Sequence, residues 1–188
     1  MNSKNPSIFK LKSLKIDLSV TRIANVHYFE FLKNSRTISD NHPFRELLFI
    51  DSGSVKVESN DFNGILKSKE LIIHKSNEPH SFSCVGETAP NVVIIGFECA
   101  SSKLDFFSDR ATSLTADLAK MLADVVREGQ HVFLPPYNVP NTTNMKKRHS
   151  RIYGADQMLK IKLEAFLINL IRESTTTPWI DKKSKNNG

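Results

Sequence analysis

The spacing of apolar residues changes near Cys99, and this change constrains the fold more than any other feature of the sequence. Before Cys99 the apolar residues form short runs bounded by turn-forming residues, for example at 46–50, 70–73 and 91–99. Runs of this kind are typical of β-strands. After Cys99 they recur at intervals that place them on one side of a helix. We therefore predict a mostly β fold that ends in two amphipathic α-helices.

Turn-forming residues divide the β-rich part into hairpins. Gly53 lies where a tight reversal requires a positive φ, and Asn60-Asp61 together with Asn63-Gly64 marks the next reversal. The segment before the change of period contains about eight short strand candidates at close spacing. This pattern indicates a sandwich or a small barrel, because closure of the sheet hides the strand edges.

Three polar residues fall on the apolar faces of these strands. On one extended segment, His42 and Glu46 would point to the same side as Leu48. His80 opens a later strand and shares its face with Phe82. Burial of an imidazole or a carboxylate is costly unless a partner satisfies it. We therefore expect the three polar groups to meet inside a closed barrel.

The spacing of these residues resembles the first sequence motif of the cupin family. That motif is His-x-His, three or four residues, Glu, six residues and Gly. Here Asp40-x-His42, Glu46 and Gly53 have this spacing, with Asp40 in the position of the first His. The resemblance implies a cupin-like barrel, a double-stranded β-helix.

The second cupin motif is Pro-x-Gly, two residues, His, three residues and Asn. Its spacing aligns with Lys75-x-Asn77, His80 and Cys84, so the histidine is kept and the other three residues differ. Metal binding in cupins depends on these motif residues, and their replacement leads us to expect no cofactor and no metal here.

The same polar residues suit the recognition of a small molecule. We predict that His42, Glu46 and His80 orient a small polar ligand by hydrogen bonds, while Tyr28 supplies a stacking face. A structural role for these buried polar groups remains open. If a metal bound instead, His42, Glu46 and His80 would be its ligands, with Asp40 as a fourth.

Two helices are predicted after the barrel. The first covers apolar positions from 114 to 125, with Gly129 as its expected stop, and the second runs from about 154 to 173. Their stripes repeat the same offsets, so they can pack on each other, on the barrel or on a second copy, and we predict a homodimer. The long segment between them, which contains three prolines, excludes a helix-turn-helix, whose turn has about 3–4 residues.

The order of these parts resembles the N-terminal half of AraC-type transcriptional regulators. The resemblance covers about residues 20–175 and depends on order more than on any single motif. The segments that carry it are 45–48 with Ser52-Gly53, 70–80, 96–99 and 159–172. It implies a barrel that binds a small effector, often a sugar or a related metabolite, and helices that mediate dimerisation.

The resemblance also implies a division of the chain. We predict an N-terminal arm at 1–20, a cupin-like effector-binding barrel at 21–110, a helical dimerisation region at 111–175 and a linker at 176–188. In such regulators a region with helix-turn-helix units follows and contacts DNA, and we expect that region to be missing from this chain. The preferred function is therefore that of a sensor and dimerisation domain, not of an enzyme.

Two other functions remain open from the sequence. The first is a small metal-dependent cupin enzyme, an isomerase or a dioxygenase, in which a metal polarises the substrate or activates oxygen. The second is a module that binds only protein partners, which a barrel filled with side chains would favour.

Composition and charge limit the partners and the cellular location that we expect for the protein. The net charge of +6 is concentrated in two basic clusters, so the barrel region is close to neutral and has no basic stripe for nucleic acid. The clusters consist of Lys146, Lys147, Arg148, Arg151, Lys182, Lys183 and Lys185.

No apolar run is long enough for a membrane span and no signal-peptide core is present, so we expect a cytoplasmic protein without membrane contact. Its two cysteines, Cys84 and Cys99, are expected to be buried free thiols.

Overall fold

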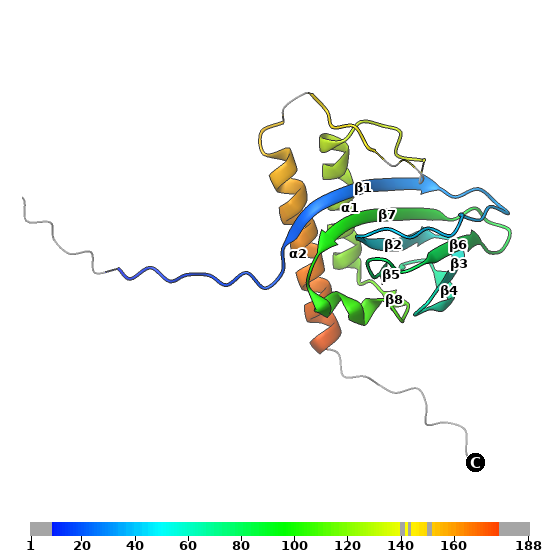
Figure 1. The fold of residues 1–188 in the computed structure, drawn as a ribbon, viewed down its shortest axis with the longest axis horizontal. Coiled ribbons are helices and arrows are strands. Elements are labelled where there is room, and N and C mark those ends of the chain that lie inside the picture. Colours follow the sequence, from blue (N-terminus) through cyan, green and yellow to red (C-terminus); the bar gives the residue numbers. More distant parts are fainter. Residues whose placement is uncertain (1–8, 140–141, 143, 150–151, 177–188) are drawn as a thin grey trace, which may run out of the picture.

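The protein consists of a two-sheet β-barrel followed by two long helices (Figure 1). A computed structural model describes residues 9–139, 142, 144–149 and 152–176. Within them the elements are β1 (Val20–Glu30), β2 (Arg45–Ser52), β3 (Ser54–Ser59), β4 (Asn63–Lys67), β5 (Glu70–His74), β6 (His80–Cys84), β7 (Asn91–Cys99), the 3₁₀-helix η1 (Ser102–Phe107), β8 (Thr112–Ser113), α1 (Ala116–Val132) and α2 (Ala155–Thr176).

The strands form two antiparallel sheets. A five-stranded sheet has the order β1-β7-β2-β5-β8, and a three-stranded sheet has the order β4-β3-β6. The reversal between β2 and β3 occurs at Gly53, whose φ of 78° confirms the predicted turn. The second reversal, between β3 and β4, falls at residues 60–62, also as predicted.

Alternate side chains of the five-stranded sheet enter two separate cores. Leu48 and Ile50 point into the barrel and pack with residues of the three-stranded sheet. Leu47 and Phe49 point to the opposite face, where they pack with residues of α1 and α2. The sheet is therefore covered on both faces, which explains why β2 and β7 are nearly continuous apolar runs instead of alternating ones.

The two helices extend beyond their predicted limits. Thr115 caps α1, since its Oγ1 accepts a hydrogen bond from the Leu118 N–H. The prediction that Gly129 stops the helix is wrong, because α1 continues to Val132. Gly129 instead lies against Val26 of β1, where an added Cβ would come within 2.9 Å of the valine Cβ. Its small size serves helix–sheet packing and not helix termination.

The segment before β1 runs away from the barrel as an extended arm (Figure 1). Its apolar side chains at Leu11 and Leu14 are 97% and 91% exposed. The predicted linker begins at Thr176, the last residue of α2, and the rest of it, 177–188, lies outside the described residues. In the part of the chain that the structure describes, no helix is long and apolar enough to cross a membrane.

Candidate functional site

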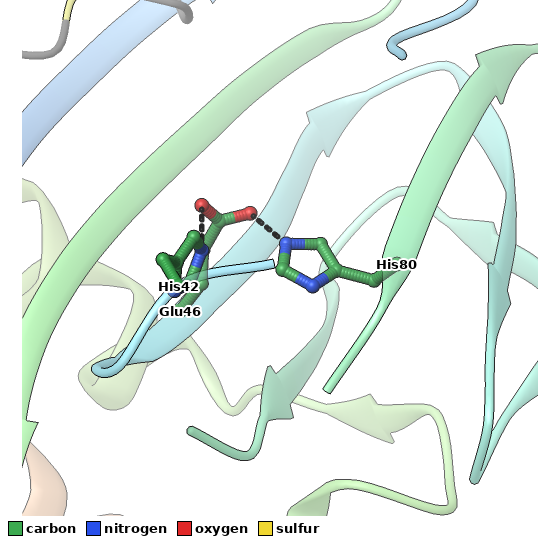
Figure 2. Close-up of side chains that lie close together, drawn as sticks. All are labelled: His42, Glu46 and His80. Carbon is green, nitrogen blue, oxygen red and sulfur yellow. Dashed lines mark ion pairs between the residues drawn. The ribbon is translucent and has the colours of Figure 1, made fainter. Parts of the chain in front are cut away.

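His42, Glu46 and His80 meet inside the barrel, as their spacing predicted (Figure 2). Glu46 Oε2 lies 3.4 Å from His42 Nε2, and Glu46 Oε1 lies 3.3 Å from His80 Nε2. Glu46 is on β2 and His80 begins β6, so two strands from different sheets supply the carboxylate and one imidazole.

His42 reaches this cluster in a way that the sequence did not predict. It was expected to share one extended strand with Glu46, but β2 begins only at Arg45. Pro43 follows His42 and cannot donate a ladder hydrogen bond, which is consistent with a loop at this point. The His42 ring stacks on Phe44 with 3.8 Å between ring centroids, and this contact holds the imidazole against the end of β2.

Backbone carbonyls fix the tautomers of both imidazoles. His42 Nδ1 lies 2.9 Å from the Phe44 carbonyl oxygen, and His80 Nδ1 lies 2.7 Å from the Glu78 carbonyl oxygen. A carbonyl oxygen only accepts hydrogen bonds, so each Nδ1 must carry a hydrogen. In the neutral form of either ring, Nε2 then presents a lone pair toward the Glu46 carboxylate.

Two lone pairs that face a carboxylate require a positive charge between them. Protons on the Nε2 atoms, or a bound cation, would supply it. Burial raises the pKa of Glu46, but hydrogen bonds from His42 and His80 and the charges of His80 and His74 outweigh this effect and lower the pKa to about 2. Burial lowers the pKa of His80, and its interaction with Glu46 outweighs that and raises it. Without a metal, these shifts favour a carboxylate on Glu46 that is paired with an imidazolium on His80.

The same three groups also fit a divalent transition metal. They offer two imidazole nitrogens and a carboxylate oxygen, all within 4.8 Å of one another. Ligands placed about 2.0–2.1 Å from a tetrahedral ion are about 3.3–3.4 Å apart, which matches both distances to Glu46. The carbonyls on the two Nδ1 atoms are the outer partners that metal-binding histidines usually have.

His74 belongs to this cluster but was not predicted from the sequence. It is fully buried and pairs across the sheet with Glu46, and its ring stacks on that of His80 with 4.2 Å between centroids. Within the described residues neither of its ring nitrogens has a hydrogen-bond partner. No sequence motif marks His74, because its position depends on the register between β2 and β5.

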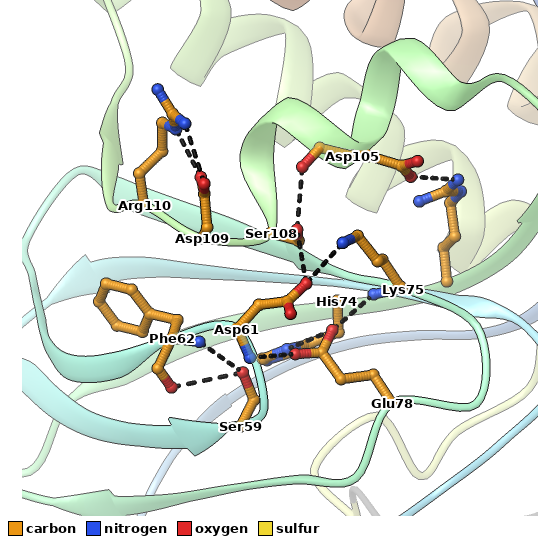
Figure 3. Close-up of polar contacts among 11 residues, drawn as sticks. Ser59, Asp61, Phe62, His74, Lys75, Glu78, Asp105, Ser108, Asp109 and Arg110 are labelled. Atoms are coloured by element: carbon orange, nitrogen blue, oxygen red, sulfur yellow. Dashed lines mark hydrogen bonds and ion pairs between the residues drawn. The ribbon is translucent and has the colours of Figure 1, made fainter.

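A second polar network holds the outer side of His74 (Figure 3). Glu78 lies 3.8 Å from His74 Nδ1 and accepts hydrogen bonds from the backbone N–H groups of Asp61 and Lys75. Burial raises the pKa of Glu78, but its His74, Ser59 and backbone contacts together lower it to about 2. The Asp61 carboxylate in turn accepts from Lys75 and Ser108, so the network connects the cluster to the segment after η1.

The barrel leaves little free space beside the cluster. A cavity of about 30 Å³ lies against Glu46 and His80, with Asp40 and Phe82 among its walls. A water needs about 10–15 Å³ of such volume, so this cavity holds one or two waters or one ion. A sugar-sized molecule does not fit unless side chains move.

Tyr28 lies apart from these residues. It was expected to offer a stacking face within the barrel, but it points to the outer face of the five-stranded sheet and is 42% exposed. Its hydroxyl donates to Asp51. The neighbouring Phe29 takes the inward position, because successive residues of a strand point to opposite faces.

Comparison with solved structures places both parts of the chain in one known arrangement. The structure of apo ToxT K231A from Vibrio cholerae is similar over 87% of this chain and 59% of that chain, with a TM-score of 0.52 and 10% sequence identity. A cupin 2 domain-containing protein from Halorhodospira halophila is similar over 52% of this chain and 63% of that chain, with a TM-score of 0.35 and 22% identity. The fold is a cupin-like, double-stranded β-helix barrel with two C-terminal helices, as predicted.

Sequence comparison adds little to this result. No protein-family model matches the chain. The tRNA modification GTPase MnmE of Photobacterium profundum is 26% identical over 145 residues, which are 75% of this chain and only 30% of that protein. No glycine in this sequence is followed by lysine, so the phosphate-binding loop G-x-x-x-x-G-K-[ST] of many GTPases is absent.

Proposed function

We propose that this chain is the sensor and dimerisation part of an AraC-type transcriptional regulator. The observation that carries the proposal is that the similarity to ToxT, an AraC-family regulator, extends over both the barrel and the helices. A small effector would bind this part, and DNA would be contacted by a separate helix-turn-helix region. Such a regulator would act in the cytoplasm.

The surface of α2 supports dimerisation. Leu159, Leu163 and Phe166 are buried against the rest of the protein, yet two further apolar residues of the helix lie outside this buried stripe. These residues, Met158 and Ile161, are 43% and 46% exposed. Apolar side chains exposed outside the buried stripe of a helix gain from a further partner, so Met158 and Ile161 favour a second copy at this side of α2.

The dimer is tested by one substitution on α2 and a matched control on the barrel. Ile161→Glu places a charge on the proposed interface, and we expect it to convert a dimer into a monomer in sedimentation-velocity ultracentrifugation. Ile65→Glu on β4 introduces the same change at a position with nearly equal exposure, 47%, and we expect it to leave the dimer intact. A wild-type monomer, or equal effects of both substitutions, would contradict the proposal.

A second candidate function is favoured by the His42, Glu46 and His80 cluster. Their geometry fits a divalent metal, and a small metal-dependent cupin enzyme, an isomerase or a dioxygenase, would use such an ion. The ion would supply a Lewis acid for the substrate or a site for oxygen. The three side chains would hold the ion, and the backbone carbonyls of Phe44 and Glu78 would keep both imidazoles in the ligating tautomer.

Metal content distinguishes a metal centre, which the enzyme requires, from a metal-free cluster. Elemental analysis of the purified protein should find near-stoichiometric metal if the site is a metal centre, and a His42→Ala, His80→Ala double variant should lose it. His149→Ala removes an exposed histidine and serves as the control. Absence of tight metal in the wild type would count against the enzyme and leave the sensor proposal standing.

A further inference from the structure

A cavity ten times larger than the one in the barrel lies between the five-stranded sheet and α1. Its volume is about 330 Å³, against about 30 Å³ beside Glu46 and His80. Small-molecule sites usually have about 300–1,000 Å³, and of these two cavities the one under α1 has a volume in that range. Phe49 and Val93 line it from the sheet, and Leu122 and Val126 line it from the helix.

Small residues on α1 keep this cavity open. Ala119 and Ala123 are one helical turn apart on α1, and both line the cavity together with Phe49 of the sheet. Longer side chains at these two positions would fill the space between helix and sheet, as Leu122 and Val126 do beside them. The gap is therefore a consequence of side-chain size along one stripe of α1.

The walls of the cavity combine apolar side chains with polar groups of two kinds. On the side of the sheet, the Asp51 carboxylate accepts hydrogen bonds from Tyr28 and Lys69, and Lys69 holds its pKa below the usual range. On the side of α1 are the amide of Gln130 and the guanidinium of Arg127.

Of these polar groups, Arg127 is the one suited to a ligand with negative charge. Arg127 pairs with Asp124 on the same helix, and its side chain is 67% exposed. Exposed pairs of this kind contribute little to stability, so a ligand can replace the aspartate at low cost. The ionised Asp51 would repel an anion, which directs a ligand's negative group away from it and toward Arg127.

We propose that this cavity binds a small organic carboxylate with a compact aromatic or branched apolar body, and that it is the effector site of the sensor. The apolar body would lie on Phe49 and Val93, and the carboxylate would pair with Arg127. The assignment as an effector site rests on the proposed function, whereas the binding of a carboxylate in this cavity does not require that function.

The position of the cavity gives a bound molecule direct access to the helices. One of its walls is α1, and α1 is joined to α2 by the buried Glu128, which pairs with Lys162. A molecule wedged under α1 therefore acts on the element that holds the proposed dimer helix. The barrel cluster, by contrast, has no wall formed by α1 or α2.

The test is an NMR titration of the ¹⁵N-labelled full chain with 2-naphthoate. We expect chemical-shift changes centred on α1 and β2 near Phe49 and Asp51, with a Kd of about 1 mM or below for a ligand of this size. Ala119→Leu fills the cavity and should weaken binding about tenfold or more. Ala116→Leu makes the same change at an exposed position of α1 and should have no effect.

A second variant addresses the carboxylate without filling the cavity. Arg127→Gln should weaken 2-naphthoate about three- to tenfold and leave the neutral 2-naphthalenemethanol unchanged, because only the charged pair is lost. Lys120→Ala, exposed on the same helix, is the control. No shifts in the wild type up to about 10 mM, unchanged affinity in Ala119→Leu, or shifts centred on His80 would overturn the inference. The dimer test with Ile161→Glu is independent, so the proposed function can fail or stand separately.

Discussion

Replacement of Glu46 by glutamine tests whether the metal-free cluster is held by charge. Glu46→Gln keeps the shape of the side chain and removes the negative charge that faces both Nε2 atoms. The pKa of Glu46 is lowered from 4.5 to about 2 in the folded protein. A shift of this size corresponds to about 3 kcal/mol of stability, since one unit equals about 1.4 kcal/mol.

The sign of the pH dependence follows from both partners. The lowered pKa of Glu46 stabilises the folded state above pH 4.5, and this contribution is lost as the pH falls toward 2. The raised pKa of His80 stabilises the folded state below pH 6.5, and this contribution is lost as the pH rises through the folded-state pKa. Both describe one interaction, so the energy of about 3 kcal/mol is counted once.

The expected result is a bell-shaped difference between wild type and Glu46→Gln. Urea unfolding of chelator-treated protein at one protein concentration, followed by circular dichroism from pH 2.5 to 8, should give the largest loss of unfolding free energy between pH 4.5 and 6.5. Glu58→Gln removes a carboxylate on β3 whose pKa is lowered by Lys56 and Arg36, neither of which loses its charge below pH 8, so its effect should fade only toward low pH and give no bell. A difference that does not vary with pH would refute the charge argument.

Three further substitutions test the packing that supports the site, each by thermal unfolding. Gly129→Ala should destabilise by about 1–3 kcal/mol despite better helix propensity, because the new Cβ would press on Val26. Lys162→Met should destabilise by about 2–4 kcal/mol at neutral pH, since it leaves the buried Glu128 carboxylate without its lysine. Arg45→Met should cost about 2–4 kcal/mol, because the buried guanidinium donates to two carbonyls and pairs with a carboxylate after β7.

The strands were predictable because the apolar runs and the turn residues that define them are local features of the sequence. The run 91–99 coincides with β7, since it is buried on both faces and reads as continuous apolar sequence. The turn at Gly53 was equally predictable, because a tight reversal requires the positive φ that glycine adopts readily. The same reasoning failed at Gly129, where the constraint is the approach of β1 from far away in the sequence and not the local chain.

The candidate site was predictable only where a motif gave the spacing. His42, Glu46 and His80 came together as expected, although His42 does so from a loop. His74 was missed because its contact with Glu46 depends on strand register, which a single sequence does not specify. Tyr28 was assigned to the wrong side of the sheet for a similar reason, although its alternation with Phe29 could have excluded it from the barrel.

The free volume in the barrel decides what a metal at the cluster could do. A catalytic ion needs an open coordination position that the substrate can reach, whereas a structural ion is enclosed by its ligands. The cavity beside Glu46 and His80 accepts an ion or one or two waters and leaves no room for an organic substrate. A metal found there would therefore fit a structural role and would remain compatible with a sensor whose effector binds under α1. The enzyme would require, in addition to metal, an opening of the wall formed by Asp40 and Phe82.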